Sequence, residues 1–355
     1  MRGLEWDGNP TTPGGPRNWA PILYVCHSVY GSADAARRLL ARGADPNATF
    51  ENEYGDMSAL YGAAGVLHDP ELTRVLLEAG ADPDDGESVY HSCEAESAAC
   101  LRLLLEHGAT IAGTVALPHA LDYEHPEHVR LLLDAGADPN EYANVVHAVG
   151  RGRGPETIRL LAQYGADLEQ PEDGLTAYKH AVRRNREDVT STLVELGAAP
   201  EADELDHALG AVSRGDPPKE LPGDLDDDGA EIAILAALSG PTDAIVDLVG
   251  VGFHGRVHGS PDGTLLHHAA WVGRPSVVER LLERGADPNA RSGADFDTPL
   301  AWAALGSRAH ELPGRDYVAV AEHLVAAGAE IEPRLAEVAS GPLADWAGPE
   351  TTDRP

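Results

Sequence analysis

The sequence predicts an all-α repeat solenoid, a stack of helix pairs rather than a domain around one central core. A short phrase, typified by LLERGADPN from residue 281, recurs nine times along the 355 residues. Aromatic residues make up only 5% of the chain and hydrophobic residues 43%, so Ala, Leu and Val must form most of the core, which suits closely packed helices. No apolar run reaches the roughly 18 residues of a membrane-spanning helix.

The recurring phrase marks where each repeat ends. Its nine glycines are Gly43, Gly80, Gly108, Gly136, Gly165, Gly197, Gly252, Gly285 and Gly328. A helix that ends in a leucine run needs a left-handed residue just past its end, and glycine adopts that conformation at least steric cost. The Asp-Pro-Asn that often follows is typical of a turn. Each copy therefore predicts the end of a helix and the start of a loop.

Two further signals complete the repeat. Prolines lie about ten residues before five of the glycines, where a first helical turn tolerates them: Pro70, Pro126, Pro155, Pro241 and Pro275. An Ala-rich apolar stretch, such as TLLHHAAWVG from residue 264, precedes each of these prolines. The repeat is therefore helix, tight turn, helix, loop. Steps of 28 and 29 residues between glycines predict short loops in the middle, whereas a step of 43 leaves room for a hairpin at 285–300.

These residues resemble the ankyrin repeat, in which an inner helix with Thr-Pro-Leu-His-x-Ala-Ala precedes an outer helix that ends in Gly-Ala-Asp-x-Asn. DGTLLHHAA at 262, DTPLAWAA at 297 and DGLTAYKHA at 173 carry the likeness, which covers about 20–331. The resemblance implies an ankyrin repeat solenoid of about nine helix-turn-helix repeats with short or hairpin loops and a C-terminal capping helix. It also implies that His267 bridges the Thr264 hydroxyl and the backbone of the neighbouring repeat. Such folds imply interaction scaffolds rather than enzymes.

One step between glycines, of 55 residues, divides the predicted domains. We expect a disordered leader at 1–17, an N-terminal stack of about six repeats at 18–200, an irregular acidic segment or hinge at 201–229, a C-terminal stack of about three repeats at 230–331, and a capping helix with a tail at 332–355. Within 201–229 a first helix lacks its second helix. A hinge is the plainer interpretation of this segment, and an acidic docking arm is the alternative.

Charge and composition limit the partners and the compartment. The formal charge of −33, from 59 acidic and 26 basic side chains, disfavours direct binding of nucleic acid or of an anionic membrane. There is no signal-peptide segment, and three cysteines do not suggest a disulfide framework. We therefore predict a cytoplasmic protein and expect a monomer. The preference for Arg over Lys indicates a GC-rich bacterial genome.

No pattern predicts catalysis, a cofactor or a metal site. The chain has no Gly-rich phosphate loop, no nucleophile elbow and no His-Glu-x-x-His motif. His91, Cys93 and Cys100 resemble a soft-metal cluster, but both cysteines fall at core positions of their repeats. DLDDDGAEIAIL at 224–235 matches only the first half of an EF-hand loop, so a solvated acidic turn that caps a helix is favoured over calcium. We predict that the protein is not an enzyme.

Four histidines fall one position after the motif histidine of their repeats: His91, His119, His180 and His268. The plainer interpretation is that a half-buried ring suits the space between stacked first helices. The alternative is a series of imidazoles, one in each of these repeats, that titrates at about pH 6 and so regulates assembly or binding.

The predicted function is a scaffold or adaptor that binds a protein partner, with a basic one favoured, in the concave groove of the C-terminal repeats. Tryptophan and arginine anchor interfaces, and the predicted contacts are Arg256, His258, Trp271, Arg291, Phe296 and Trp302. The alternative for both tryptophans is that they only fill space between repeats. The alternative function is an acidic inhibitor or nucleic-acid mimic that occupies a basic site on an enzyme.

Overall fold

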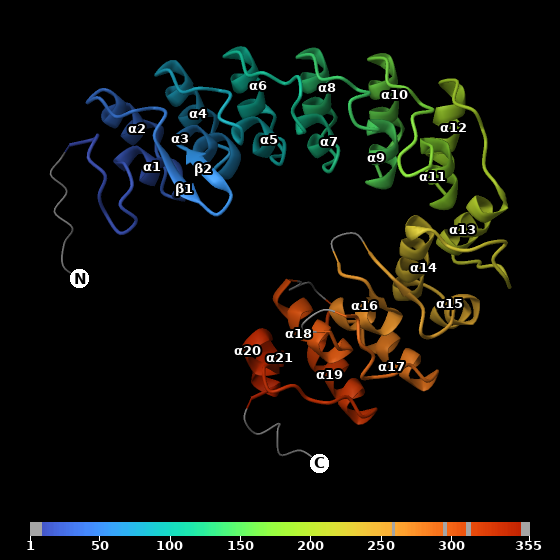
Figure 1. The fold of residues 1–355 in the computed structure, drawn as a ribbon. Helices are drawn as coiled ribbons and strands as arrows, with labels where there is room; N and C mark the ends of the chain where they lie inside the picture. Colours follow the sequence, from blue (N-terminus) through green and yellow to red (C-terminus); the bar gives the residue numbers. More distant parts are fainter. Residues whose placement is uncertain (1–8, 258–259, 294–296, 310–313, 349–355) are drawn as a thin grey trace. The chain divides into compact units, whose positions relative to one another are not determined.

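The structure, a computed structural model, describes residues 9–257, 260–293, 297–309 and 314–348 (Figure 1). The described chain is mostly helical, with two two-stranded hairpins. It divides into two compact units: unit 1 comprises Met1–Tyr178 and Asp188–Pro200, and unit 2 comprises Lys179–Glu187 and Glu201–Pro355. Most of α11 (Ala177–Arg183) belongs to unit 2, and most of α12 (Glu187–Glu195) belongs to unit 1.

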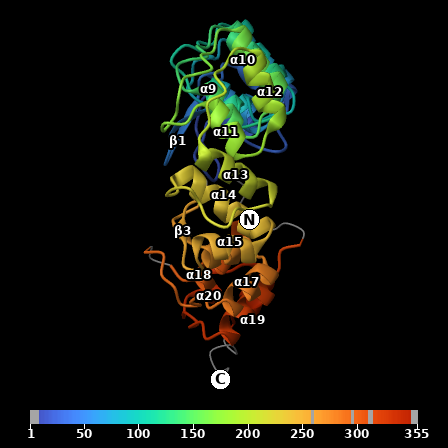
Figure 2. The same cartoon turned by 90° about the vertical axis from the view of Figure 1, so that its right-hand side faces the viewer.

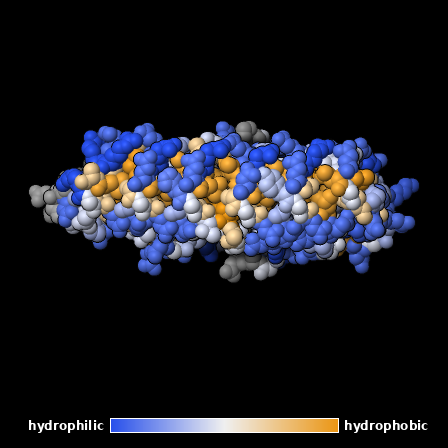
Figure 3. Space-filling view, turned by 90° about the horizontal axis from the view of Figure 1, so that it is seen from above, coloured by the Kyte–Doolittle hydropathy of each residue, from blue (hydrophilic) through white to orange (hydrophobic). Residues whose placement is uncertain are grey.

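Helix pairs stack in unit 1 so that first helices pack on first helices and second helices on second helices. The first helices are α1 (Pro21–Cys26), α3 (Ala59–Tyr61) with its π-helical continuation Gly62–Val66, α5 (Ser88–Ser92), α7 (Ala116–Ala120) and α9 (Asn144–Gly150). The second helices are α2 (Ala33–Leu40), α4 (Pro70–Glu78), α6 (Ala99–Glu106), α8 (Pro126–Asp134) and α10 (Pro155–Gln163). Figure 3, a view from the side of the second helices, shows hydrophilic residues in ridges with apolar residues gathered between them.

Unit 2 repeats the same arrangement. Its first helices are α14 (Asp227–Ser239), α16 (Leu265–Trp271) and α18 (Pro299–Ala309), and its second helices are α15 (Thr242–Val249), α17 (Pro275–Glu283) and α19 (Tyr317–Ala326). The second helices α15 and α17 lie side by side (Figure 2). Fully buried leucines and isoleucines from both sets, among them Ile245, Leu265, Leu281 and Leu324, form the core of this unit.

Both ends of unit 2 depart from a plain helix pair. α13 (Glu204–Arg214) packs against α14 and is followed by no second helix, as the sequence predicts. Two short helices, α20 (Leu335–Val338) and α21 (Gly341–Trp346), stand where one capping helix was expected. They are separate because Ala339 is extended and Pro342 starts a new first turn. The predicted domain limits at 18–200, 201–229, 230–331 and 332–355 stay a prediction.

The helix ends follow the signals in the sequence. A proline occupies the first turn of α4, α8, α10 and α17, as expected. In eight of the nine copies the expected glycine has a φ between +87° and +104°. The seventh copy differs, because the glycine with the positive φ, +88°, is Gly250, which ends α15 two residues before the expected Gly252.

The hairpins are β1 (Thr49–Asn52) with β2 (Gly55–Ser58), and β3 (His254–Gly255) with β4 (Gly263–Thr264). The finger expected at 285–300 has no strand in its described residues, although the Ser292 N–H donates to the Asp297 carbonyl oxygen at 3.0 Å. The described residues include no helix with both the length and the hydropathy to span a membrane.

Candidate functional site

The histidine pair that opens α16 belongs to the scaffold. His267 is fully buried: its Nδ1 accepts from the Thr264 N–H at 3.1 Å and lies 2.8 Å from Thr264 Oγ1, and its Nε2–H donates to the Asp297 carbonyl oxygen at 2.8 Å. Both contacts implied by the resemblance are confirmed. His268 is buried as well, and its Nε2 lies 3.0 Å from the Gly255 carbonyl oxygen. Burial lowers the pKa of both imidazoles below its usual range.

One of the two tryptophans of the predicted surface, Trp302, packs on these histidines and on the other tryptophan, Trp271. The Trp302 ring lies 5.1 Å from that of His267, 5.2 Å from that of His268 and 5.8 Å from that of Trp271, measured between centroids. Trp302 is only 1% exposed, so its side chain fills space between repeats, which is the alternative that the sequence left open. We therefore leave Trp302 out of the proposed surface. Trp271 is only partly buried, at the C-terminal end of α16.

Arg315 and Tyr317, at the start of α19, hold the backbone around Trp271. The Tyr317 hydroxyl donates to the Trp271 carbonyl oxygen at 3.0 Å, and the Arg315 guanidinium donates to that of Val272 at 2.6 Å. Gly306 of α18 lies so close that a Cβ there would overlap the Trp271 carbonyl oxygen. These contacts hold the backbone at the C-terminal end of α16 in place without a bound partner.

The two arginines of the predicted partner-binding surface, Arg256 and Arg291, lie at the other end of α16. Arg291 is exposed, with its Nη1 2.7 Å from Asp297 Oδ1, and Arg256 is exposed just after β3, which pairs with the β4 strand that precedes α16. A helix of seven residues is about 10 Å long, so Arg256 and Arg291 lie near the opposite end of α16 from Trp271. His258 and Phe296 lie outside the described residues.

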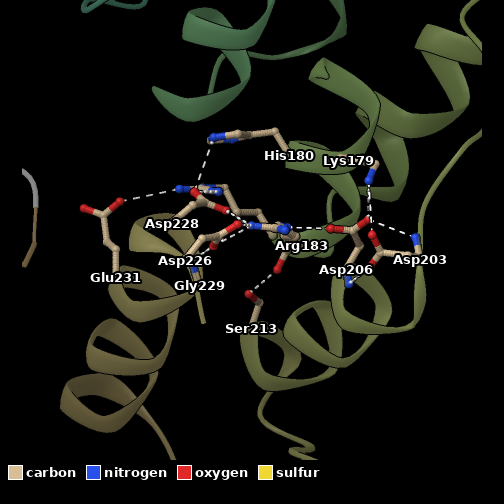
Figure 4. A network of polar contacts seen from close by, with 11 residues as sticks. Lys179, His180, Arg183, Asp203, Asp206, Ser213, Asp226, Asp228, Gly229 and Glu231 are labelled. Atoms are coloured by element: carbon tan, nitrogen blue, oxygen red, sulfur yellow. Dashed lines mark hydrogen bonds and ion pairs between the residues drawn. The ribbon is translucent and has the colours of Figure 1, made fainter. Parts of the chain in front are cut away.

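A buried ion-pair network joins α11 to the acidic segment within unit 2 (Figure 4). The Arg183 side chain is 4% exposed; its Nε lies 2.6 Å from Asp206 Oδ1 and its Nη1 2.8 Å from both carboxylate oxygens of Asp226. Lys179 Nζ lies 3.1 Å from Asp203 Oδ2 at the start of α13. The segment 201–229 is therefore bonded to α11, and its role as a hinge stays a prediction.

His180 and the acidic turn belong to the same network. Arg184 Nη1 lies 2.7 Å and His180 Nε2 3.3 Å from Asp228 Oδ1. Burial, reinforced by Arg184, lowers the pKa of His180 to about 4, although Asp228 opposes the shift. Asp226 caps α14 by accepting from the Gly229 N–H at 2.8 Å, as expected of the turn. Asp226 and Asp228 of the turn bind arginines, whereas the sequence suggested a merely solvated turn.

Sequence reasoning missed a site on the first helices of unit 1. Aromatic and imidazole rings form an unbroken series of contacts, which we call the aromatic row: Trp19, Tyr24, His27, Phe50, Tyr61, Tyr90, His91, His119, Tyr123, His125 and His128. Tyr90 and His119 stack with centroids 3.6 Å apart and planes 9° apart. His91 and His119 of the predicted column lie in this row with side chains 27% and 10% exposed, so they differ from the deeply buried His268.

Three carboxylates, Glu87, Glu94 and Asp122, lie along the row, and we call them the row carboxylates. Glu94 Oε1 is 2.7 Å from His91 Nδ1 and 3.2 Å from His119 Nε2, so it bridges two consecutive repeats. A signal for this site exists in the sequence: HSCE at 91–94 and HALD at 119–122 place an acid three residues after a histidine in successive repeats.

The cysteines are structural. Cys26, Cys93 and Cys100 are free and buried, and burial raises the pKa of Cys93 to about 12, so its thiol is not poised to become a thiolate ligand. Among the described residues, no three or more His, Cys, Asp and Glu side chains are grouped so as to hold a metal ion.

The helix pairs, glycine caps and Thr–His contacts define an all-α repeat solenoid. A family model described as ankyrin repeats, in three copies, matches residues 57–143, and a model of a single ankyrin repeat matches residues 263–293. This chain is an ankyrin repeat protein, of a family that is generally a non-enzymatic protein-interaction fold.

Similar solved structures include the ankyrin repeat domain of Bcl-3, described as a unique member of the IkappaB protein family, at 28% identity and a TM-score of 0.41, over 50% of this chain and 86% of that one. An ankyrin repeat domain from Acinetobacter baumannii AYE is 24% identical with a TM-score of 0.44, over 50% of this chain and 98% of that one. No curated protein sequence matches this chain.

Proposed function

We propose that this protein is a non-enzymatic scaffold that binds a protein partner along α16 of unit 2, through Trp271 at one end and Arg256 and Arg291 at the other. The observation that carries the proposal is Trp271, a partly buried ring beside the buried Trp302 on a backbone held by Arg315 and Tyr317. A side chain that is ordered beforehand loses little entropy on binding. Tryptophan and arginine are also the residue types that most often dominate binding energy.

Affinity capture from a lysate of the native organism, with the full chain as bait, tests this surface. We would compare the wild type with Trp271→Ala and Arg291→Ala, at low and at moderate salt, and identify the retained proteins by mass spectrometry. Arg280→Ala is the matched control, because Arg280 is half exposed on α17 and has only a 3.5 Å ion pair with Asp243. A partner kept by the wild type and the control but lost by Trp271→Ala supports the proposal. A partner that all variants retain contradicts it.

The alternative of an acidic inhibitor or nucleic-acid mimic is favoured by the charge of −33. Such a protein would hold its partner through dispersed carboxylates, so added salt would weaken the complex steeply and duplex DNA would compete with it. A partner that Trp271→Ala still binds, but that leaves on addition of DNA, would favour this alternative over the α16 surface.

A further inference from the structure

Both ring nitrogens of two histidines in the aromatic row face carboxylates. His91 Nε2 lies 3.3 Å from Glu87 Oε2 and its Nδ1 2.7 Å from Glu94 Oε1. His119 repeats the pattern, with Nε2 3.2 Å from Glu94 Oε1 and Nδ1 3.3 Å from Asp122 Oδ2. The three row carboxylates therefore converge on two imidazoles of consecutive repeats.

The charged groups around the row carboxylates also favour a cationic partner. Asp122 Oδ1 lies 2.7 Å from Arg151 Nε and 3.0 Å from His147 Nε2. The three row carboxylates thus face one guanidinium, that of Arg151, together with the imidazoles of three histidines, His91, His119 and His147. The side chains of the row carboxylates are 28% to 35% exposed, so a partner can reach them. Burial and then the charges of Asp122, Glu94 and Glu87 raise the pKa of Tyr90, as expected of a ring in a negative field.

An open pocket of about 540 Å³ lies beside Tyr90. The loops that precede α5 and α7 form its walls, and Val89 and Val115 give it apolar lining next to Asp84. These are the short loops of the repeats that have no hairpin. An apolar residue of a bound chain can therefore be buried next to the charged row.

We propose that this face of α5 and α7 binds an extended segment of a partner protein that carries a basic side chain at every third residue. Guanidinium or ammonium groups can donate charge-assisted hydrogen bonds to the partly exposed row carboxylates, and they stack favourably on tyrosine rings. Neighbouring helices lie about 8 to 10 Å apart. A polyproline II chain has three residues per turn and rises about 3.1 Å per residue, so every third side chain returns to the same face after about 9 Å. Successive basic residues thus meet successive repeats.

A synthetic peptide of arginine-proline-proline repeats, labelled with a fluorophore, is the probe. Its anisotropy is measured against the full-length protein at about 0.15 M NaCl, where long-range attraction to the acidic surface is largely screened, and at about pH 8. A peptide of the same composition with its arginines adjacent is the matched control. We expect the spaced peptide to bind at least about tenfold more tightly, because only its arginines match the repeats. Equal binding, or no binding of the spaced peptide, overturns the proposal.

Variants locate the binding on the protein. Glu94→Gln removes the bridging carboxylate and should weaken binding by about tenfold, as expected for the loss of a charge-assisted hydrogen bond. Glu106→Gln makes the same charge change at an exposed position of α6 and should weaken binding by less than about twofold. Equal weakening by the two variants means that general charge attraction holds the peptide, and the proposal fails.

Two further variants control for misfolding and for binding of the peptide at the α16 surface. Glu87→Gln loses a single 3.3 Å contact with His91, so it should fold normally by circular dichroism and still weaken binding by several-fold. A folded Glu87→Gln that binds like the wild type contradicts the proposal. Trp271→Ala, which lies in unit 2, should bind the peptide unchanged, and a loss of binding there would show that the peptide occupies a different surface.

Discussion

At the scale of single residues, Arg183 shows how unit 2 depends on one buried charge. Its guanidinium lies between Asp206, which is fully buried, and Asp226. Two charges taken out of water are tolerable together because each satisfies the other, but either one alone is costly. The packing of the acidic segment 201–229 therefore depends strongly on its ion pairs with α11. An ion pair of this kind need not make the protein more stable than an apolar pair in the same place would.

We predict that Arg183→Met lowers the free energy of unfolding of unit 2 by about 3 to 5 kcal/mol, because it removes the 2.6 Å ion pair of the buried Asp206 carboxylate and leaves it the longer, 3.5 Å pair with Lys179. Urea denaturation followed by circular dichroism measures the change. Arg280→Met is the control: its pair with Asp243 is about half exposed on both sides, and its loss should cost less than about 1 kcal/mol. A similar cost for both variants would mean that the burial of Arg183 has no energetic consequence.

His180 predicts a pH dependence. Its folded-state pKa of about 4 lies below the ordinary value of 6.5, so on acidification the unfolded chain takes up the proton first. The contribution of the neutral ring is complete above about pH 6.5, is lost as the pH falls towards 4, and changes no further below that. We expect the stability of the wild type relative to His180→Gln to fall by about 3 kcal/mol over this range. Parallel denaturation midpoints for the two proteins at every pH would contradict this.

At the scale of elements, α16 and α18 pack with their backbones unusually close. Gly306 is buried against the Trp271 carbonyl oxygen, and no side chain fits between them. Because cores are close-packed, an added methyl group there must push the two helices apart. The same approach positions Trp271, so the stability of the helix pair and the geometry of the proposed α16 surface depend on one glycine.

We predict that Gly306→Ala destabilises unit 2 by about 1 to 3 kcal/mol, even though alanine is the better helix former. Gly252→Ala is the matched control, since nothing lies within 4 Å of a Cβ built there and its φ is not positive. Thermal denaturation should show a lower midpoint for Gly306→Ala and little change for the control. A midpoint for Gly306→Ala at or above that of the wild type would show that the helices separate without cost.

How far the sequence predicts these elements depends on whether the signal is local. Leucine runs, first-turn prolines and C-terminal glycines act within a few residues, so the helix pairs and the missing partner of α13 could be predicted. The aromatic row could not, because rings of different repeats, such as Tyr90 and His119, meet only when the two repeats stack. The burial of Trp302 was hidden for the same reason, since a single repeat does not show which ring the next repeat covers. The shift from Gly252 to Gly250 is a choice between two glycines that the pattern leaves equivalent.

At the scale of the whole molecule, the chain carries far more negative charge than its ion pairs can neutralise, with 59 acidic against 26 basic side chains. Uncompensated like charges destabilise a folded chain by self-repulsion. Many of the pairs are exposed, such as Arg38 with Asp34, and exposed pairs contribute little each. Salt screens both the repulsion and these exposed pairs, while the Arg183 network is screened less because it is buried.

We therefore predict that added salt stabilises this protein. The Debye length falls from about 30 Å at 0.01 M salt to about 10 Å at 0.1 M, so repulsion among distant carboxylates is lost before contacts at 3 Å are weakened. The urea midpoint should accordingly rise between about 0.01 and 0.3 M NaCl, and the rise should level off once the screening length is shorter than the spacing between repeats. An equal concentration of sucrose separates screening from general exclusion effects. A midpoint that falls with salt would mean that attraction within the ion-pair networks outweighs the net charge, and the acidic surface would then be a source of stability.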